Sequence, residues 1–425
     1  DMVHPYLRRK QGLEAATYPD DAIKEVLERT LGVPIFQEQV IKLAMVAAGF
    51  SGGEADQLRR AITSWGRNSK LLTFEEKLTQ GMIERGYSED FSRRLFEQIK
   101  GFGGYGFPES HSASFALLAY ISAWLKCHHP AAFVAGLLNS QPMGFYSPSQ
   151  LIQDARRHGV TVLSIDVNHS DWDHQLLDSR SAQQNQPALR LGLRLVRGLS
   201  RQGAQRVIEA RQRNPFRQIS HLRQWAALNK RDMEALADAD ALQSLSGHRH
   251  QSQWQIMALE QPKPLLRDEQ YQNASYFDDG VQLPAPQIAE EVLSDYRATG
   301  LTLRAHPLSL LRDRAPFNRC KRHTDLASIG HKRFVRIAGL VTCRQRPGTA
   351  SGVLFLTLED ETGNSNIVVW ERTQQHFRQA LMNGKLLLIN GIVETKDNVT
   401  HVIAGALYDY SHELGNLSVQ SHDFH

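Results

Sequence analysis

The chain has 425 residues, a length typical of about three domains. Hydrophobic residues make up 41% and charged residues 22%, which excludes a collagen-like, mucin-like or wholly disordered protein. The net charge is only +4. The three cysteines, Cys127, Cys320 and Cys343, lie far apart. Their spacing excludes a CxxC zinc site, and their small, odd number argues against a secreted disulfide scaffold. No run approaches the roughly 18 apolar residues of a membrane span, so we expect a cytoplasmic protein without membrane contact. The chain opens on Asp1 rather than an initiator Met, and we expect it to be a piece of a longer protein.

Residues 1–160 have helical periodicity and are interpreted as one partial helical domain. Ser51 and Glu54 have the spacing of a capping box that opens a helix. Ser110–Lys126 is expected to form a long, mostly apolar helix that is buried. Further helices are expected at Gln37–Phe50, Thr73–Arg85 and Ser88–Lys100, and one that begins at Ser147-Pro148.

The middle region, residues 161–260, changes character. Val160–Val167 and Leu189–Leu195 are expected to be strands, and short helices follow them. Between Arg190 and Arg213 there are seven arginines and a single acid, Glu209. This block of charge suits a polyanion better than a small neutral ligand.

The segment Val196–Ala204 and the helix after it have the shape of a helix-hairpin-helix. Gly198 permits a tight turn, the second helix would present backbone N–H groups to a DNA phosphate, and Arg197, Arg201 and Arg206 would add charge. The alternative is an ordinary helix–turn–helix corner with a solvated basic face. A second hairpin-like unit at Lys230–Leu245 lacks the expected glycine in its turn and is interpreted as structural.

Residues 261–330 are read as a linker with connecting helices, because 261–286 hold four prolines and no clear period. Residues 331–411 are expected to form an OB-fold barrel, and 412–425 a tail, because five strands with a helix between the third and fourth are typical of that barrel. The expected strands are Phe334–Arg346, Val353–Leu358, Asn366–Trp370, Lys385–Val393 and Val399–Leu407, with a helix at Arg372–Leu381. The predicted fold class is α+β multidomain.

The barrel region offers two kinds of candidate contact to nucleic acid. Arg336, Arg344 and Arg346 lie on the polar side of the first expected strand and are candidates for backbone contacts. Aromatic side chains can stack on unpaired bases, but they can equally fill the barrel core. The three aromatic candidates are Phe334, Phe355 and Trp370.

Two further patterns point weakly to a nucleotide. Arg59 and Arg60 are adjacent on a helix, and guanidinium forks bind phosphate bidentately. The glycine-rich loop 100–111 offers Tyr105 and His111. On these residues alone a solvated helix face, a packed tyrosine and a capping histidine are the favoured alternatives. No carboxylate pair lies on a strand flanked by apolar residues, as two-metal phosphoryl transfer requires, so the residues contain no complete catalytic centre.

Several long motifs together resemble one family. Gly32–Val40, Ala48–Ala61, Tyr105–His111 and Ala123–Lys126 are similar to the fingers region of bacterial C-family DNA polymerases, the polymerase III alpha subunit and its relatives. The Pro-Glu-Ser-His variant and Leu138–Ser149 resemble the error-prone, damage-induced member. The resemblance implies the same order of parts: fingers, tandem helix-hairpin-helix, linker and OB domain.

The resemblance also implies what these parts do. The family's incoming-nucleotide contacts map onto Arg59, Arg60, Tyr105 and His111, and Arg197, Gly198, Arg201 and Arg206 would hold DNA. The palm that carries the catalytic aspartates would lie upstream, so the ligands of Mg²⁺ are expected outside this chain. We do not expect direct sliding-clamp binding, because Gln272–Phe277 has Ser275 where an apolar residue is wanted.

The sequence therefore predicts the C-terminal part of an error-prone DNA-directed DNA polymerase for damage-induced (translesion) synthesis. This part would bind primer-template DNA and deoxynucleoside triphosphates, would work with accessory mutagenesis proteins, and would be inactive alone. The alternative hypothesis is a non-catalytic DNA-binding accessory protein built from helix-hairpin-helix and OB domains.

Overall fold

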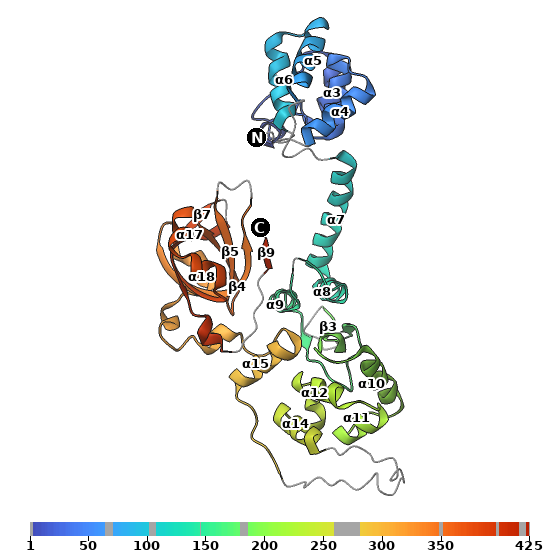
Figure 1. Cartoon of the computed structure of the whole chain (residues 1–425), viewed down its shortest axis with the longest axis vertical. Coiled ribbons are helices and arrows are strands. Elements are labelled where there is room, and N and C mark those ends of the chain that lie inside the picture. Colours follow the sequence, from blue (N-terminus) through green and yellow to red (C-terminus); the bar gives the residue numbers. More distant parts are fainter. Residues whose placement is uncertain are drawn as a thin grey trace. The chain divides into compact units, whose positions relative to one another are not determined.

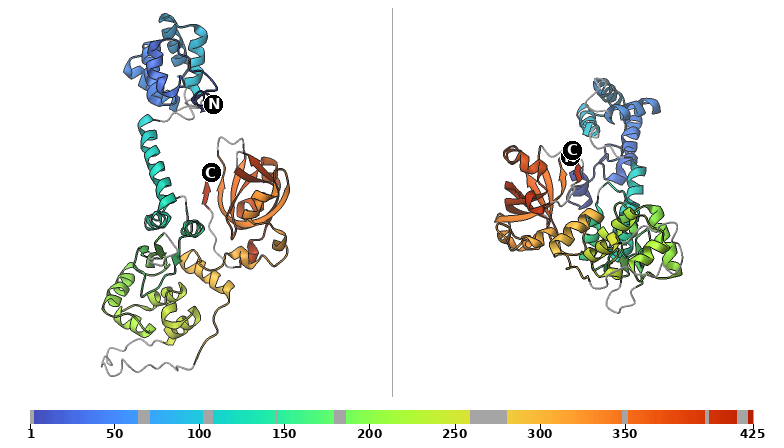
Figure 2. Two further views of the ribbon diagram at one scale, coloured as in Figure 1. Left: turned by 180° about the vertical axis from the view of Figure 1, so that it is seen from behind. Right: turned by 60° about the horizontal axis from the view of Figure 1, so that its bottom comes forward.

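The computed structural model describes residues 3–63, 71–101, 108–144, 146–178, 186–258, 281–347, 352–396, 399–415 and 422–424. The chain divides into two compact units, Asp1–Trp124 and Leu125–His425, which are coloured along the sequence in Figure 1 and drawn in two further views in Figure 2. Each unit is described by itself.

The first unit is helical, as its periodicity predicts. Its helices are α1 Val3–Lys10, α2 Asp21–Leu27, α3 Gln37–Ala48, α4 Gly52–Thr63, α5 Leu71–Glu84, α6 Glu89–Gly101 and most of α7 Glu109–His128. The apolar stripes of α3 to α6 meet in one core, where Leu43, Leu58, Met82 and Phe96 are almost completely buried.

The predicted capping box at the start of α4 is confirmed. The Ser51 amide donates to the Glu54 carboxylate (3.0 Å), and the Glu54 amide donates to the Ser51 hydroxyl (3.4 Å). These two bonds satisfy amide groups that a helix N-terminus otherwise leaves unpaired. They fix where α4 begins, and so which way Arg59 and Arg60 point from it.

Helix α7 contradicts its predicted burial. It forms where expected, but none of its side chains is buried. Six large apolar residues are between 44% and 70% exposed: Phe115, Leu117, Leu118, Tyr120, Ile121 and Trp124. Apolar composition predicted the helix correctly but could not say which part of the protein would cover it.

The second unit begins with α8 Pro130–Asn139 and α9 Pro148–Arg157, where Ser147 caps the helix as predicted. A small sheet follows, with strand order β1-β3-β2. Its strands, β1 Val162–Leu163, β2 Gln175–Leu177 and β3 Ala188–Arg190, are shorter than predicted, and Leu193–Leu195 is a 3-10 turn rather than a strand. Five helices complete this region: α10 Arg201–Arg213, α11 Ile219–Trp225, α12 Lys230–Asp238, α13 Gln243–Ser246 and α14 Arg249–Ala258.

The C-terminal region is a closed five-stranded barrel, which confirms the OB-fold prediction. Its strands are β4 Phe334–Gln345, β5 Leu354–Glu359, β6 Asn364–Val369, β7 Leu386–Lys396 and β8 Val399–Asp409. They are ordered β5-β6-β8-β7-β4, and β4 also pairs with β5 to close the barrel. Two short helices, α17 Glu371–His376 and α18 Arg378–Asn383, separate β6 from β7, and a short strand β9 His422–Phe424 runs parallel to β4.

Helix α15 (Ile288–Thr299) covers part of the outer face of this barrel. Its buried Val292 and Tyr296 belong to the same apolar cluster as Leu340 of β4 and Leu388 of β7. The helix therefore continues the core of the barrel beyond the strands. The small helix α16, Leu326–Ile329, precedes β4.

Candidate nucleic-acid interface

Arg59 and Arg60 share one carboxylate on α4. Arg59 Nε donates to Asp56 Oδ1 (2.9 Å), and Arg60 Nη2 lies 2.8 Å from Asp56 Oδ2. The Arg59 hydrogen bond, followed by the charges of both arginines, lowers the pKa of Asp56. The arginine side chains are 33% and 74% exposed. A phosphate that bound both guanidinium groups would have to compete with this aspartate.

The other two predicted nucleotide contacts are only partly described. His111 lies in the first turn of α7, where its exposed ring is 4.3 Å from the ring of Phe115. Tyr105 lies outside the described residues. The structure thus brings Arg59 and Arg60 together and places His111 on a different helix.

The first predicted hairpin has the expected turn but an unexpected partner. Gly198 adopts a left-handed backbone (φ +89°), and the Ser200 hydroxyl accepts from the Gly203 amide (2.9 Å) at the start of α10. The buried carboxylate of Asp232 accepts from both the Ser200 amide (2.9 Å) and the Ser200 hydroxyl (3.0 Å). An aspartate therefore occupies the amide that directly precedes α10, the helix that the sequence predicts to present its amides to a DNA phosphate.

Two of the arginines predicted to hold DNA donate to the protein itself. Arg197 donates to the carbonyl oxygens of Tyr296 (3.3 Å) and Arg297 (3.1 Å) at the end of α15. Arg206 donates to the Ala226 carbonyl (2.9 Å). Arg201 differs, because its guanidinium lies 5.9 Å from the centre of the Trp172 ring rather than on a backbone carbonyl.

The rest of the arginine block is also tied into the fold. Arg190 donates to the Ser164 carbonyl (2.8 Å), and Arg194 donates to the Asn139 carbonyl (2.7 Å). Arg211 is hydrogen-bonded to the Ser170 carbonyl, and burial lowers its pKa. Most of this charge therefore stabilises irregular backbone, a use that a count of arginines cannot distinguish from DNA binding.

A second hairpin, which the sequence analysis missed, joins α11 to α12. Ala227 adopts a left-handed backbone (φ +48°), Leu228 is buried, and the Asn229 side chain accepts from the Asp232 amide (2.8 Å). The first hairpin has the same three features in the same order: Gly198 has a left-handed backbone, Leu199 is buried, and the Ser200 side chain accepts from an amide in the first turn of α10. The two turns are therefore structural repeats, and the second has a regular helix on each side.

The signal for this repeat is present in the sequence. Leu199-Ser200-Arg201 and Leu228-Asn229-Lys230 have the same pattern of apolar, capping and basic residue. Alanine stands where a glycine was expected, which hid the second turn. The sequence instead predicts the turn of the second hairpin-like segment at 237–242. In the structure this turn lies at the end of α12 and contains Asp240, whose φ is +55°.

The second hairpin also exposes its charge. Lys230 and Arg231 open α12 and are exposed, and Trp225, the last residue of α11, is 41% exposed. The Lys230 side chain is 75% exposed and lies 3.7 Å from Glu234. Backbone amides in the first turn of a helix have no partner within the helix. The Asn229 side chain caps the Asp232 amide, and the amides of Lys230 and Arg231 lie beside the exposed cations of the same two residues.

In the barrel, one of the three predicted arginine contacts is contradicted. Arg344 is buried and donates to the carbonyl oxygens of Leu381 (2.7 Å) and Gly384 (2.5 Å). The register of β4 shifts between Val341 and Cys343. Strict alternation of inward and outward residues therefore could not predict the environment of Arg344, which lies beyond the shift.

Arg336 and Arg346 remain closer to the surface. Arg336 is half-buried and donates to Asn390 Oδ1 (3.0 Å), while Arg346 is exposed. The aromatic candidates divide in the same way. Phe334 is 66% and Trp370 52% exposed, so neither fills the barrel core, whereas Phe355 is half-buried.

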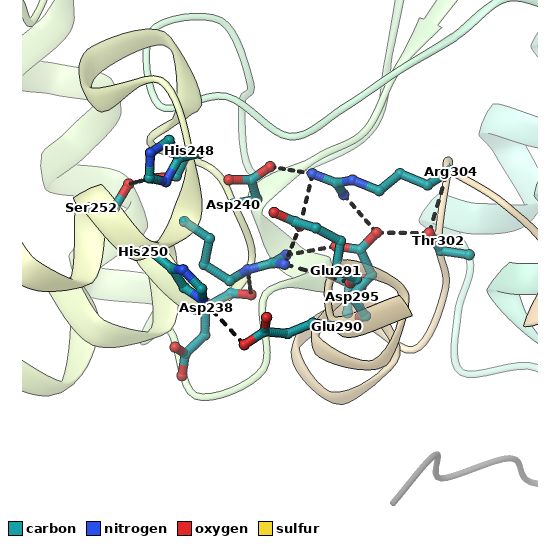
Figure 3. A network of polar contacts seen from close by, with 12 residues as sticks. Asp238, Asp240, His248, His250, Ser252, Glu290, Glu291, Asp295, Thr302 and Arg304 are labelled. Carbon is teal, nitrogen blue, oxygen red and sulfur yellow. Dashed lines mark hydrogen bonds and ion pairs between the residues drawn. The ribbon is translucent and has the colours of Figure 1, made fainter. Parts of the chain in front are cut away.

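A buried polar network connects the hairpin region to α15 (Figure 3). Arg249 of α14 is bonded to Glu291 and lies 2.6 Å from Asp295, and Arg304 lies 2.6 Å from Asp240 and 2.7 Å from Asp295. Burial raises the pKa of Glu291 and of Asp240, and the two guanidinium groups oppose this shift. The network fixes α15, and with it the barrel face that α15 covers, to the helices that follow the second hairpin.

The described residues offer neither a metal-binding cluster nor a membrane-spanning helix. No group of three or more His, Cys, Asp or Glu side chains that could hold a metal ion occurs among them. Within the same part of the chain, no helix has both the length and the apolar character needed to cross a membrane.

Comparison with known families finds three matches in chain order. Residues 1–86 match the bacterial DNA polymerase III alpha subunit finger domain, residues 159–252 a helix-hairpin-helix motif, and residues 335–409 an OB-fold nucleic acid binding domain. The predicted fold class, with helical fingers, helix-hairpin-helix and OB-fold parts, is confirmed.

Curated relatives match the chain from end to end. It is 58% identical over 426 residues to the error-prone DNA polymerase of Saccharophagus degradans, and 55% identical to those of Teredinibacter turnerae and Alkalilimnicola ehrlichii. In each comparison all of this chain aligns with 41% of the relative. The chain is thus similar over its whole length to bacterial error-prone DNA polymerases, and it spans about two fifths of the length of the curated relatives it matches.

Proposed function

We propose that this chain is the substrate-holding part of an error-prone DNA-directed DNA polymerase, a nucleotidyltransferase that acts in translesion synthesis in the bacterial cytoplasm. The observation that carries this proposal is its 58% identity, over its whole length, to a curated error-prone DNA polymerase. The complete enzyme would extend a primer 3′ end by joining deoxynucleotides and releasing pyrophosphate.

The helical fingers would hold the incoming deoxynucleoside triphosphate. Arg59 and Arg60 would receive its phosphates, because two guanidinium groups beside a single carboxylate keep a net positive charge and a fork geometry suited to phosphate. Tyr105 and His111 would complete the pocket. Asp56 keeps both arginines on the same side of α4 before the nucleotide arrives.

Helix-hairpin-helix contacts to duplex DNA would come mainly from the second hairpin. Lys230 and Arg231 are exposed in the first turn of α12, where backbone amides have no partner within the helix, whereas the Ser200 amide of the first hairpin is bonded to Asp232. Arg201 of the first hairpin is exposed as well. Contacts of this kind read phosphates and not bases, which suits an enzyme that must follow any template.

The barrel would hold single-stranded template. Phe334 is exposed at the start of β4, and it directly follows the exposed Lys332 and Arg333. An aromatic ring beside cations can stack a base while the cations bind its backbone. Arg336 and Arg346 would extend this surface along the strand.

The catalytic metal ions, which we propose to be Mg²⁺, would be held by residues outside this chain, because two-metal nucleotidyl transfer requires clustered carboxylates. We expect recruitment by accessory mutagenesis proteins rather than by direct clamp binding. Residues 272–277, on which the expectation about the clamp rests, lie outside the described part of the structure.

Primer extension tests the proposal. The polymerase that contains this chain should extend a primed template in a metal-dependent reaction, and the 425-residue chain should bind the same template without extending it. Arg59→Glu with Arg60→Glu should raise the KM for deoxynucleotide at least ten-fold in the complete polymerase, with less than a two-fold change in the Kd for DNA. Extension by the isolated chain, or a larger loss of DNA affinity than of nucleotide affinity, would refute the assignment.

A further inference from the structure

The second hairpin carries an exposed aromatic ring in addition to its cations. Trp225 ends α11, two residues before the left-handed Ala227, and is 41% exposed. Lys230 and Arg231 follow on the other side of the same turn, and both are exposed. The indole therefore belongs to the hairpin that the proposed function assigns to duplex DNA.

The structural repeat shows that the hairpin fold itself does not require this exposure. Because Gly198 of the first hairpin corresponds to Ala227, Val196 corresponds to Trp225. Val196 is only 4% exposed and belongs to the hydrophobic core of this region. The same position of the motif is thus a core position in the first hairpin and a surface position in the second.

The Trp225 ring is supported by two other rings. The ring of His221, one turn earlier in α11, stacks on it with the ring centres 4.4 Å apart and the planes at 21°, and the ring of Phe216 stacks on it at 5.9 Å. Phe216 is buried, and the Asn168 side chain is bonded to both its amide and its carbonyl (2.9 Å each). A ring held in this way loses little conformational freedom when it contacts a ligand, so the exposed indole is preorganised for binding.

The structure of duplex DNA limits what such a ring can contact. In a continuous duplex the faces of the bases are covered by the neighbouring base pairs. A ring that lies beside bound phosphates therefore meets the deoxyribose, which proteins contact together with the phosphates. The sugar presents apolar C–H groups, so an indole can bury apolar surface against it. Such a contact does not depend on charge.

We propose that Trp225 contacts the deoxyribose next to the phosphates that the second hairpin binds, and that this contact supplies a part of the DNA affinity that does not depend on salt. The inference rests on the proposed function, which supplies the duplex. It goes beyond the phosphate contacts, because cations bind any polyanion, whereas a contact with the sugar selects for nucleic acid.

Binding of a labelled linear duplex by the 425-residue chain, measured by fluorescence anisotropy over a range of salt concentrations, tests this contact. Trp225→Ala should raise the Kd about five-fold at every salt concentration, because it removes apolar contact area. The slope of log Kd against log salt should stay that of the unsubstituted chain, because no cation is lost. Trp225→Phe retains a ring and should raise the Kd less than about two-fold.

Trp254→Ala is the matched control. It removes a tryptophan that is 46% exposed on α14, and it should change the Kd less than about two-fold. A covalently closed circular duplex, which has no terminal base pair, should show the same loss of affinity with Trp225→Ala as the linear duplex. A loss confined to the linear duplex would overturn the proposal, because it would assign Trp225 to stacking on a terminal base.

Two further results would overturn the proposal. A Trp225→Ala chain with a changed salt slope would show that Trp225 acts by positioning Lys230 and Arg231. A Trp225→Ala chain with an unchanged Kd would reject the sugar contact and leave the proposed function intact. Absence of duplex binding by the unsubstituted chain, even at low salt, would instead reject the proposed function together with this inference.

Tryptophan emission reads the contact directly. Addition of duplex DNA should change the emission of the unsubstituted chain, because a nucleotide then lies against the exposed indole. This change should be largely lost in Trp225→Phe and retained in Trp254→Phe. Equal changes in the two variants would contradict the contact.

Discussion

The carboxylate of Asp232, in the first turn of α12, accepts hydrogen bonds from both the amide and the hydroxyl of Ser200, which caps α10. One side chain therefore joins the N-termini of the helices that follow the two hairpins. Because this carboxylate is almost completely buried, it acts as a structural cross-link inside the motif, between the cap of α10 and the first turn of α12.

Asp232→Ala should destabilise this region by about 1–3 kcal/mol, because the Ser200 amide and hydroxyl lose their buried acceptor. The measurement is the urea midpoint of the transition reported by tryptophan fluorescence. Asp238→Ala is the matched control, since it removes an exposed aspartate at the other end of α12 and should change stability by less than about 0.5 kcal/mol. Equal effects of the two substitutions would exclude the cross-link.

Gly203→Ala should be destabilising although alanine is normally the better helix former. A Cβ at residue 203 would lie 2.5 Å from Asp232 Oδ2 and 2.9 Å from Ser200 Oγ, and overpacking of this kind costs about 1–3 kcal/mol. Gly136→Ala in α8 meets nothing within 4 Å and should stabilise by up to about 1 kcal/mol. Opposite signs in thermal unfolding are expected; a stabilised Gly203→Ala protein would show that the hairpin is looser than described.

The two turn residues should respond in opposite directions to exchange of glycine and alanine. Gly198→Ala places a side chain in a left-handed conformation and should cost about 1 kcal/mol. Ala227→Gly relieves the same strain and should be neutral or stabilising by up to about 1 kcal/mol. Urea midpoints of both single variants and of the double variant check this. A strongly destabilised Ala227→Gly protein would contradict the structural equivalence of the turns.

Acid should weaken the second unit through His174. Burial, followed by the charge of Arg194, lowers the pKa of His174 to about 4, and its Nδ1 accepts from the Gly192 amide (3.2 Å). The native state therefore holds the neutral ring, while the unfolded chain binds a proton below its ordinary pKa of 6.5. This contribution is fully present above pH 6.5 and is lost as the pH falls toward 4, by about 3 kcal/mol in all.

Urea midpoints between pH 7 and 4 measure this loss. The curve of His174→Gln should be flatter than that of the unsubstituted chain over this range. His158→Gln, at the exposed end of α9, should keep the full slope. A His174→Gln curve parallel to the original would assign the acid sensitivity to other groups.

The sequence was most informative where local chemistry decides the structure. The Ser51–Glu54 capping box and the five barrel strands could be predicted from spacing and alternation alone. It failed where a tertiary contact decides the outcome. Exposure of Leu117 depends on what lies beside α7, and burial of Arg344 depends on a shift in strand register.

The candidate DNA contacts illustrate the same division. A run of arginines indicates a polyanion, yet Arg197 and Arg206 donate to backbone carbonyls of the protein. The second hairpin was hidden because Ala227 takes a backbone conformation that favours glycine. The matching geometry of the two turns reveals it, and the apolar, capping and basic residues that follow each turn are the accompanying sequence signal.

Fluorescence anisotropy of a labelled primer-template tests the central claim most directly, namely that this chain grips duplex DNA by phosphate contacts at the second hairpin. The chain should bind the duplex with an affinity that falls steeply with salt. Lys230→Glu with Arg231→Glu should weaken binding at least ten-fold and reduce the salt slope by about 1 or more. Arg93→Glu with Arg94→Glu makes the same change of charge on exposed α6 residues and should change affinity less than three-fold. Absence of binding at low salt, or equal losses in the two double variants, would contradict the account.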